Sequence, residues 1–85
     1  MRRALKEDGR TFTEIAQSFD RDEWLKLRCI LFKTCLVGDS TIKNWKYGHK
    51  LPTEANRVAI MKALRRFGLE TRLSTLWPDA MEERP

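Results

Sequence analysis

The sequence has little of the material from which catalytic and metal sites are built. It contains one histidine, His49, and two cysteines, Cys29 and Cys35, among 85 residues. Three such groups at these separations match no zinc-site spacing, and no nucleophile, acid and base form a recognisable set. We therefore expect no enzyme, no metal ion, no cofactor and no small-molecule substrate. The two cysteines are expected to be buried free thiols in a reducing compartment.

Long hydrophobic runs are also missing. No apolar stretch approaches the length of about 18 residues that a membrane span needs, and Met1-Arg2-Arg3 leads into charges rather than into the apolar region of a signal peptide. We therefore expect a cytoplasmic protein, associated with the nucleoid if its host is bacterial, and no membrane partner. With 41% hydrophobic and 34% charged residues, the chain can form one domain around one small core.

Acidic residues are scarce in one third of the chain. Between Trp24 and Lys50 there are six lysines and arginines and a single acid, Asp39. The rest of the chain has eleven residues of each sign, so the whole net charge of +5 lies in this segment. A localised positive charge favours a polyanionic partner.

The pattern of apolar residues and helix caps predicts an all-α fold, a compact bundle of five helices. Thr11 and Asp20 are each followed three residues later by glutamate, the signature of a capping box. Later breaks fall at Gly38, Gly48 and Gly68. The first predicted helix begins at Thr11, and the other four span about 21–35, 39–47, 54–67 and 69–77. Residues 1–10 are expected to be a loose arm, 11–77 the domain, and 78–85 a tail.

The stretch from Leu36 to Gly48 carries a recognisable motif. Its sequence is L-V-G-D-S-T-I-K-N-W-K-Y-G, followed by H-K-L-P. It resembles the helix-turn-helix of lambda-repressor and Cro-type regulators, with six positions in register: Val37, Thr41, Ile42, Trp45, Gly48 and Pro52. The chain departs from that pattern at Phe32, where the family has a small residue, at Leu36, where it has glycine, and at Gly38, where it has serine or threonine.

This resemblance implies a sequence-specific double-stranded DNA-binding protein, a transcriptional regulator like those of phages and mobile elements. The helix over about 39–47 would enter the major groove. The residues expected to contact DNA are Arg28, Asp39, Ser40, Thr41, Lys43, Asn44, Lys46, Tyr47, His49 and Lys50. For Asp39 an N-cap role is favoured over base contact, and Arg28 is expected to lie inside a longer helix.

Ile42 and Trp45 stand three residues apart, on the face of this helix that we expect to be buried. We expect them to anchor the helix through Phe32, Leu36 and Leu64. The outward face is then left to four polar side chains suited to base edges and phosphates: Ser40, Lys43, Asn44 and Tyr47.

Two further expectations concern partners. A protein–protein interaction module, of the antitoxin or adaptor type, would use the same scaffold to hold an acidic partner. If the protein binds DNA, a homodimer through the C-terminal segment is expected, with a seam along Leu69, Leu73, Leu76 and Trp77. The same four residues could equally close the core.

Overall fold

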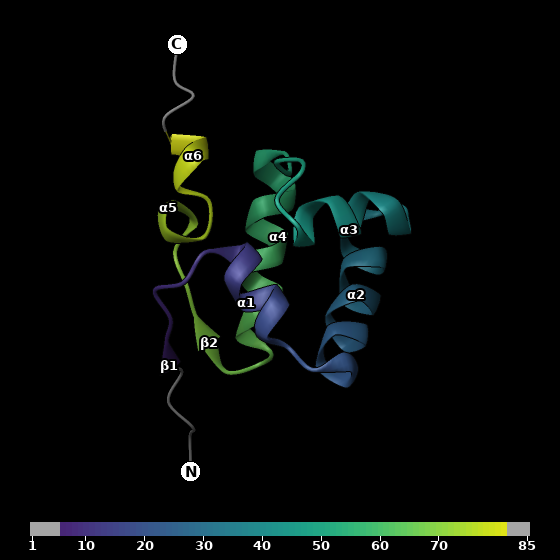
Figure 1. The fold of residues 1–85 in the computed structure, drawn as a ribbon, viewed down its shortest axis with the longest axis horizontal. Coiled ribbons are helices and arrows are strands. Elements are labelled where there is room, and N and C mark those ends of the chain that lie inside the picture. Colours follow the sequence, from purple (N-terminus) through teal and green to yellow (C-terminus); the bar gives the residue numbers. More distant parts are fainter. Residues whose placement is uncertain (1–5, 82–85) are drawn as a thin grey trace.

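The computed structural model describes residues 6–81 and is mostly helical. Its four longer helices are α1 (Phe12–Ser18), α2 (Arg21–Cys35), α3 (Asp39–Lys46) and α4 (Glu54–Arg65). Two single-turn helices follow, α5 (Leu73–Leu76) and α6 (Pro78–Met81). Two strands of two residues each, β1 (Lys6–Glu7) and β2 (Leu69–Glu70), complete the described part of the chain (Figure 1).

Local side-chain caps set the starts of three helices. Thr11 and Glu14 form a capping box at α1, and Asp20 and Glu23 form another at α2. At α4 the Thr53 hydroxyl accepts a hydrogen bond from the Asn56 backbone N–H. Each cap satisfies a backbone donor that the first helical turn leaves without a partner. The two capping boxes were predicted, and the bounds of α2 agree with the predicted range.

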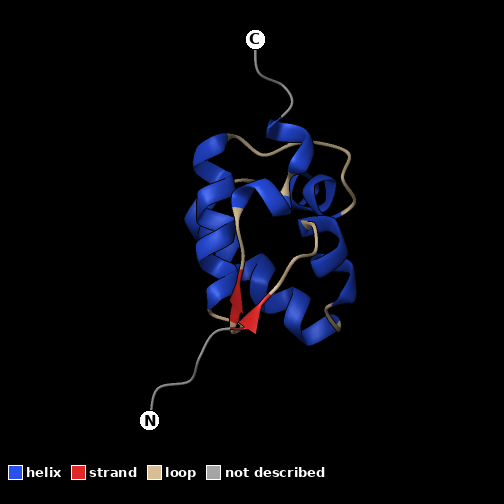
Figure 2. Cartoon of the chain, turned by 90° about the vertical axis from the view of Figure 1, so that its left-hand side faces the viewer, coloured by secondary structure: helices blue, strands red, loops and turns tan. Residues whose placement is uncertain are grey.

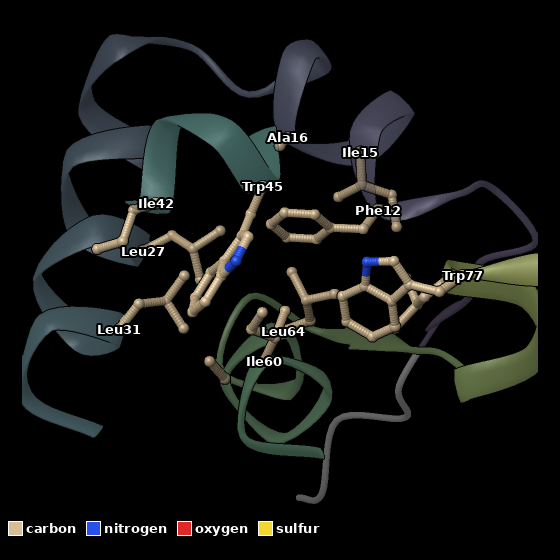
Figure 3. Packing of buried hydrophobic residues seen from close by; sticks show 12 residues of the cluster. Phe12, Ile15, Ala16, Leu27, Leu31, Ile42, Trp45, Ile60, Leu64 and Trp77 are labelled. Carbon is tan, nitrogen blue, oxygen red and sulfur yellow. The ribbon is translucent and has the colours of Figure 1, made fainter. Parts of the chain in front are cut away.

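The core lies where α1 and α3 pack against the pair formed by α2 and α4. Trp45 reaches from α3 toward Leu27 of α2 and Leu64 of α4, with Phe12 of α1 on its other side (Figure 3). Trp77 closes the far end of the core, its ring centroid 5.5 Å from that of Phe12. The buried apolar residues are Phe12, Ile15, Ala16, Leu27, Leu31, Ile42, Trp45, Ile60, Ala63, Leu64, Leu76 and Trp77.

The two strands were not predicted. β1 and β2 pair in parallel, with Lys6 opposite Leu69, and the backbone N–H of Asp8 donates to the Glu70 carbonyl at 3.0 Å (Figure 2). Part of the segment predicted as a loose arm is thus paired to the domain, while residues 1–5 lie outside the described residues. The fold is therefore mostly helical with a small two-stranded sheet, rather than helical throughout.

The C-terminal segment also differs from the prediction. A single helix was expected over 69–77, but Leu69 and Glu70 belong to β2, and the helical turn starts only at Leu73. The predicted tail contains α6, and residues 82–85 lie outside the described residues. Leu76 and Trp77 are 1% and 8% exposed. Two of the four residues of the predicted dimer seam are therefore part of the core, and the other two, Leu69 and Leu73, are half-buried.

Candidate nucleic-acid interface

Helix α3 divides into an inner and an outer face. Ile42 and Trp45 are 0% and 4% exposed, so both anchors face the core as predicted. Successive helical residues are rotated by about 100°, which places Ser40, Lys43, Asn44 and Tyr47 together on the opposite side. Ser40, Lys43 and Tyr47 are exposed and Asn44 is half-buried. The predicted outward group is thus gathered on one surface, which we call the α3 outer face.

The partners of the two anchors differ from the prediction at one position. Leu27, Leu31 and Leu64 belong to the same buried cluster, and Phe32 packs against its edge. Leu36 was expected to help anchor α3 but is 85% exposed. It ends α2 in a left-handed conformation, with φ 56° and ψ 45°, which turns its side chain out of the core.

The turn between α2 and α3 consists of residues 36–38. A left-handed backbone is costly for any residue with a Cβ atom, because that atom comes close to the following carbonyl oxygen, and glycine adopts it readily. Leu36 occupies the position at which the family that the motif resembles has glycine. Leu36 therefore holds a backbone conformation that glycine would adopt at lower cost.

An ion-pair cluster ties the start of α3 to α2. Arg28 Nη1 donates to Asp39 Oδ1, and Lys43 Nζ lies 3.7 Å from Asp39 Oδ2. The hydrogen bond from Arg28 lowers the pKa of Asp39 below its ordinary value, and the charge of Lys43 acts in the same direction. The Arg28 guanidinium also lies 5.2 Å from the Phe32 ring centroid, so packing on α2 helps to hold it.

The predicted N-cap role of Asp39 is wrong. Gly38 is the N-cap of α3 and offers no side-chain cap, and Asp39 is the first residue of the helix. At that position a carboxylate still interacts favourably with the exposed N–H groups of the first turn. Arg28 lies inside α2, as expected, and its side chain is 31% exposed.

Lys46 stands apart from the outer face, on the flank of α3 nearer the core. Its ammonium lies 4.4 Å from the Trp24 ring centroid and 5.4 Å from the Tyr47 ring centroid. Its backbone carbonyl accepts a hydrogen bond from the Gln17 side chain at 3.5 Å. The two aromatic rings thus hold a half-buried cation beside the exposed face. Thr41, also half-buried, lies on the opposite flank.

The loop after α3 folds back over the end of the helix. Gly48 has a φ of 77°, and the backbone N–H groups of His49 and Lys50 both donate to the Asn44 carbonyl, at 2.8 and 3.4 Å. These bonds satisfy a carbonyl that the helix end would otherwise leave open. His49 and Lys50 are exposed and adjoin the C-terminal end of the outer face.

Other kinds of site find little support within residues 6–81. No three His, Cys, Asp or Glu side chains in this range are grouped closely enough to hold a metal ion. No helix in the same range is long and apolar enough to cross a membrane. The prediction of two buried thiols is wrong for Cys29, which is exposed; Cys35 is half-buried, and burial raises the pKa of its thiol.

Sequence reasoning missed two of the contacts that shape this surface, the bridge from Arg28 to Asp39 and the stacking of Lys46 on Trp24. Both join residues of different helices, and no local pattern marks them. Comparison of the chain with protein-family models, with curated proteins and with solved structures finds no match.

Proposed function

We propose that the protein binds double-stranded DNA sequence-specifically and acts as a transcriptional regulator. In this proposal α2 and α3 form a helix-turn-helix of the lambda-repressor type, and α3 enters the major groove. The observation that supports it most is the division of α3: Ile42 and Trp45 are buried, while Ser40, Lys43, Asn44 and Tyr47 share the opposite face.

The side chains of the α3 outer face suit base recognition. An asparagine amide can bond adenine through two hydrogen bonds, a lysine can bond the guanine edge, and serine can bond several bases. An α-helix with its side chains is about 10–12 Å across, so the eight-residue α3 fits a major groove about 12 Å wide.

Cations at the edges of this face suit the DNA backbone. Lys46 is held by Trp24 and Tyr47 on one flank, and His49 and Lys50 lie beyond the C-terminal end. Contacts to phosphate fix the register and orientation of a protein on the duplex without reading sequence. We therefore assign Lys46, His49 and Lys50 to phosphate, and Asn44 and Lys43 to bases.

In this proposal Asp39 and Arg28 position α3 and do not contact DNA. A carboxylate at the start of α3 would repel phosphate, but Asp39 pairs with Arg28 and Lys43. The Arg28–Asp39 pair joins α2 to α3 and so sets the angle at which the outer face is presented.

One inserted helix gives a small interface, on the order of 600–1,000 Å² of protein surface. Two copies bound to a two-fold operator would double the contacts and raise specificity. We therefore propose that the protein assembles on its site as a dimer. Because Leu76 and Trp77 are buried, only Leu69 and Leu73 of the 69–77 face have surface left for a dimer seam.

The salt dependence of binding tests the proposal. Duplexes selected from a random library would be labelled, and affinity measured by fluorescence anisotropy over a range of salt. Log affinity is expected to fall against log salt with a slope of about −0.9 for each phosphate contacted. Lys50→Ala should reduce that slope by about one contact, and Asn44→Ala should relax base preference.

Lys6→Ala is the matched control for the loss of one positive charge. Lys6 is exposed on β1, at the opposite end of the molecule from α3 (Figure 1). It should leave both the slope and the base preference unchanged. A flat salt dependence, or equal effects of Lys6→Ala and Lys50→Ala, would exclude this interface.

The alternative is a protein-interaction module that uses the same helices. Such a protein would show no preference among duplexes, so the library selection itself separates the two proposals. Enrichment of one sequence family supports DNA recognition, and its absence supports the interaction module.

A further inference from the structure

A groove runs along the outside of the molecule between α2 and α4. Three adjoining hollows share Ile30 and Arg66 and so form one continuous depression, which we call the α2–α4 groove. The largest of the three hollows has a volume of about 490 Å³. The lining residues come from α2, from α4 and from Arg66 and Phe67 just after α4, and none comes from α3.

The floor of the groove is apolar at the end lined by Leu25 and Phe67. Leu25 is 41% exposed there, one of few large hydrophobic side chains with so much contact with water. Exposed apolar surface in a depression is typical of an interaction site. The other apolar side chains that line the groove are Cys29, Ile30, Ala55, Val58, Ala59, Ala63 and Phe67.

The walls of the groove carry positive charge on both sides. Lys26 and Lys33 stand on the α2 wall, and Lys62 and Arg66 stand on the α4 wall. All four are exposed, and the lining contains no carboxylate. A depression in which both helices contribute apolar and cationic side chains is complementary to a helix that carries apolar residues and carboxylates on one face.

The dimensions of the groove also suit a helix. Its lining spans residues 25–34 on α2 and 55–66 on α4. At 1.5 Å of rise per residue this is a length of about 14–16 Å, or about three helical turns. The alanines at 55, 59 and 63 recur every fourth residue, so the α4 wall is low and a third helix can approach closely.

Two other occupants fit less well. DNA would leave the apolar floor without contacts. A second copy that used the same groove in a two-fold dimer would bring its own lysines against these lysines, because such an interface pairs each patch with itself. We propose that the α2–α4 groove binds an acidic amphipathic helix of a partner protein, and that it does so separately from the α3 outer face.

The experiment uses a display library of 15-residue peptides with helix-favouring frames and randomised faces, selected on the full chain. Enriched peptides should carry apolar residues at i, i+3 or i+4, and i+7, with Asp or Glu on both sides. Their affinity, measured by anisotropy, should fall about tenfold or more in the double variant Lys62→Glu/Arg66→Glu. Lys43→Glu, the matched reversal on α3, should change it less than about twofold.

Thermal melts would confirm that both variants fold, since all the substituted side chains are exposed. Enrichment of neutral or basic peptides, no enrichment, or equal weakening by Lys43→Glu would overturn the proposal. Displacement of the peptide by duplex DNA would assign the groove to nucleic acid. A dimer in light scattering that Leu25→Ser dissociates would assign it to a second copy. Because no α3 residue lines the groove, DNA binding by α3 can fail while this proposal holds, and the reverse.

Discussion

Substitutions on the two faces of α3 should separate folding stability from DNA binding. Ile42 is fully buried, and truncating a buried isoleucine to alanine costs about 2–5 kcal/mol. A chain of 85 residues has a total stability of about 4–13 kcal/mol at 0.05–0.15 kcal/mol per residue. Ile42→Ala could therefore remove most of the stability. Ile42→Val, at about 0.5–1.5 kcal/mol, keeps the domain folded and is the informative change.

The expected result is a lower melting temperature with unchanged DNA affinity. For a domain of this size each kcal/mol shifts the melting temperature by about 4–8 °C, so Ile42→Val should lower it by about 2–12 °C. Lys43→Ala is the matched change on the outer face. The Lys43 side chain is 62% exposed, and its pair with Asp39 is a surface ion pair, so its stability should change by less than about 1 kcal/mol.

Circular dichroism during heating and during urea titration measures the stability of each variant. Anisotropy with a selected duplex, at a temperature where all the proteins are folded, measures the affinity. Lys43→Ala should weaken binding, and Ile42→Val should leave it unchanged. If Lys43→Ala lowered the melting temperature as far as Ile42→Val, or if only Ile42→Val weakened binding, the division of α3 into two faces would be refuted.

Three further predictions follow from single residues. Leu36→Gly should raise the free energy of unfolding by about 0.5–1 kcal/mol, because glycine relieves the left-handed strain at an exposed position. Leu36→Ala keeps that strain, so the same urea titration should give nearly the free energy of unfolding of the wild type. Trp77→Ala should cost about 3–5 kcal/mol by removing a buried ring that packs on Phe12, and a variant that melts like the wild type would contradict a core role for Trp77. The pKa of Asp39 is lowered from 3.8, first by the hydrogen bond from Arg28. The stabilisation from the ionised Asp39 is therefore present above pH 3.8 and is lost as the pH falls through the folded pKa. The stability difference between wild type and Asp39→Asn should shrink between about pH 5 and pH 2, and a constant difference would show that the Arg28–Asp39 pair adds nothing.

Local chemistry in the sequence determined where the helices begin and which side of α3 faces inward. The capping boxes at Thr11 and Asp20 and the cap at Thr53 involve residues only three positions apart, so they can be recognised without knowing the fold. The spacing of Ile42 and Trp45 likewise needs only the period of a helix. The outer face of the candidate site could therefore be predicted residue by residue.

The tertiary structure alone decided which helix faces meet and how the chain ends are held. The pairing of Lys6 with Leu69, the bridge from Arg28 to Asp39 and the ring of Trp24 beneath Lys46 all join residues distant in the sequence. The spacing of Leu76 and Trp77 fits a dimer seam and a core equally well. In the fold both are buried, and the Trp77 ring packs against Phe12. The packing of the helices also decided that Cys29 and Leu25 are exposed in the α2–α4 groove. Helix α2 has apolar residues around much of its circumference, and only the packing of neighbouring helices determines which of these residues remain in contact with water.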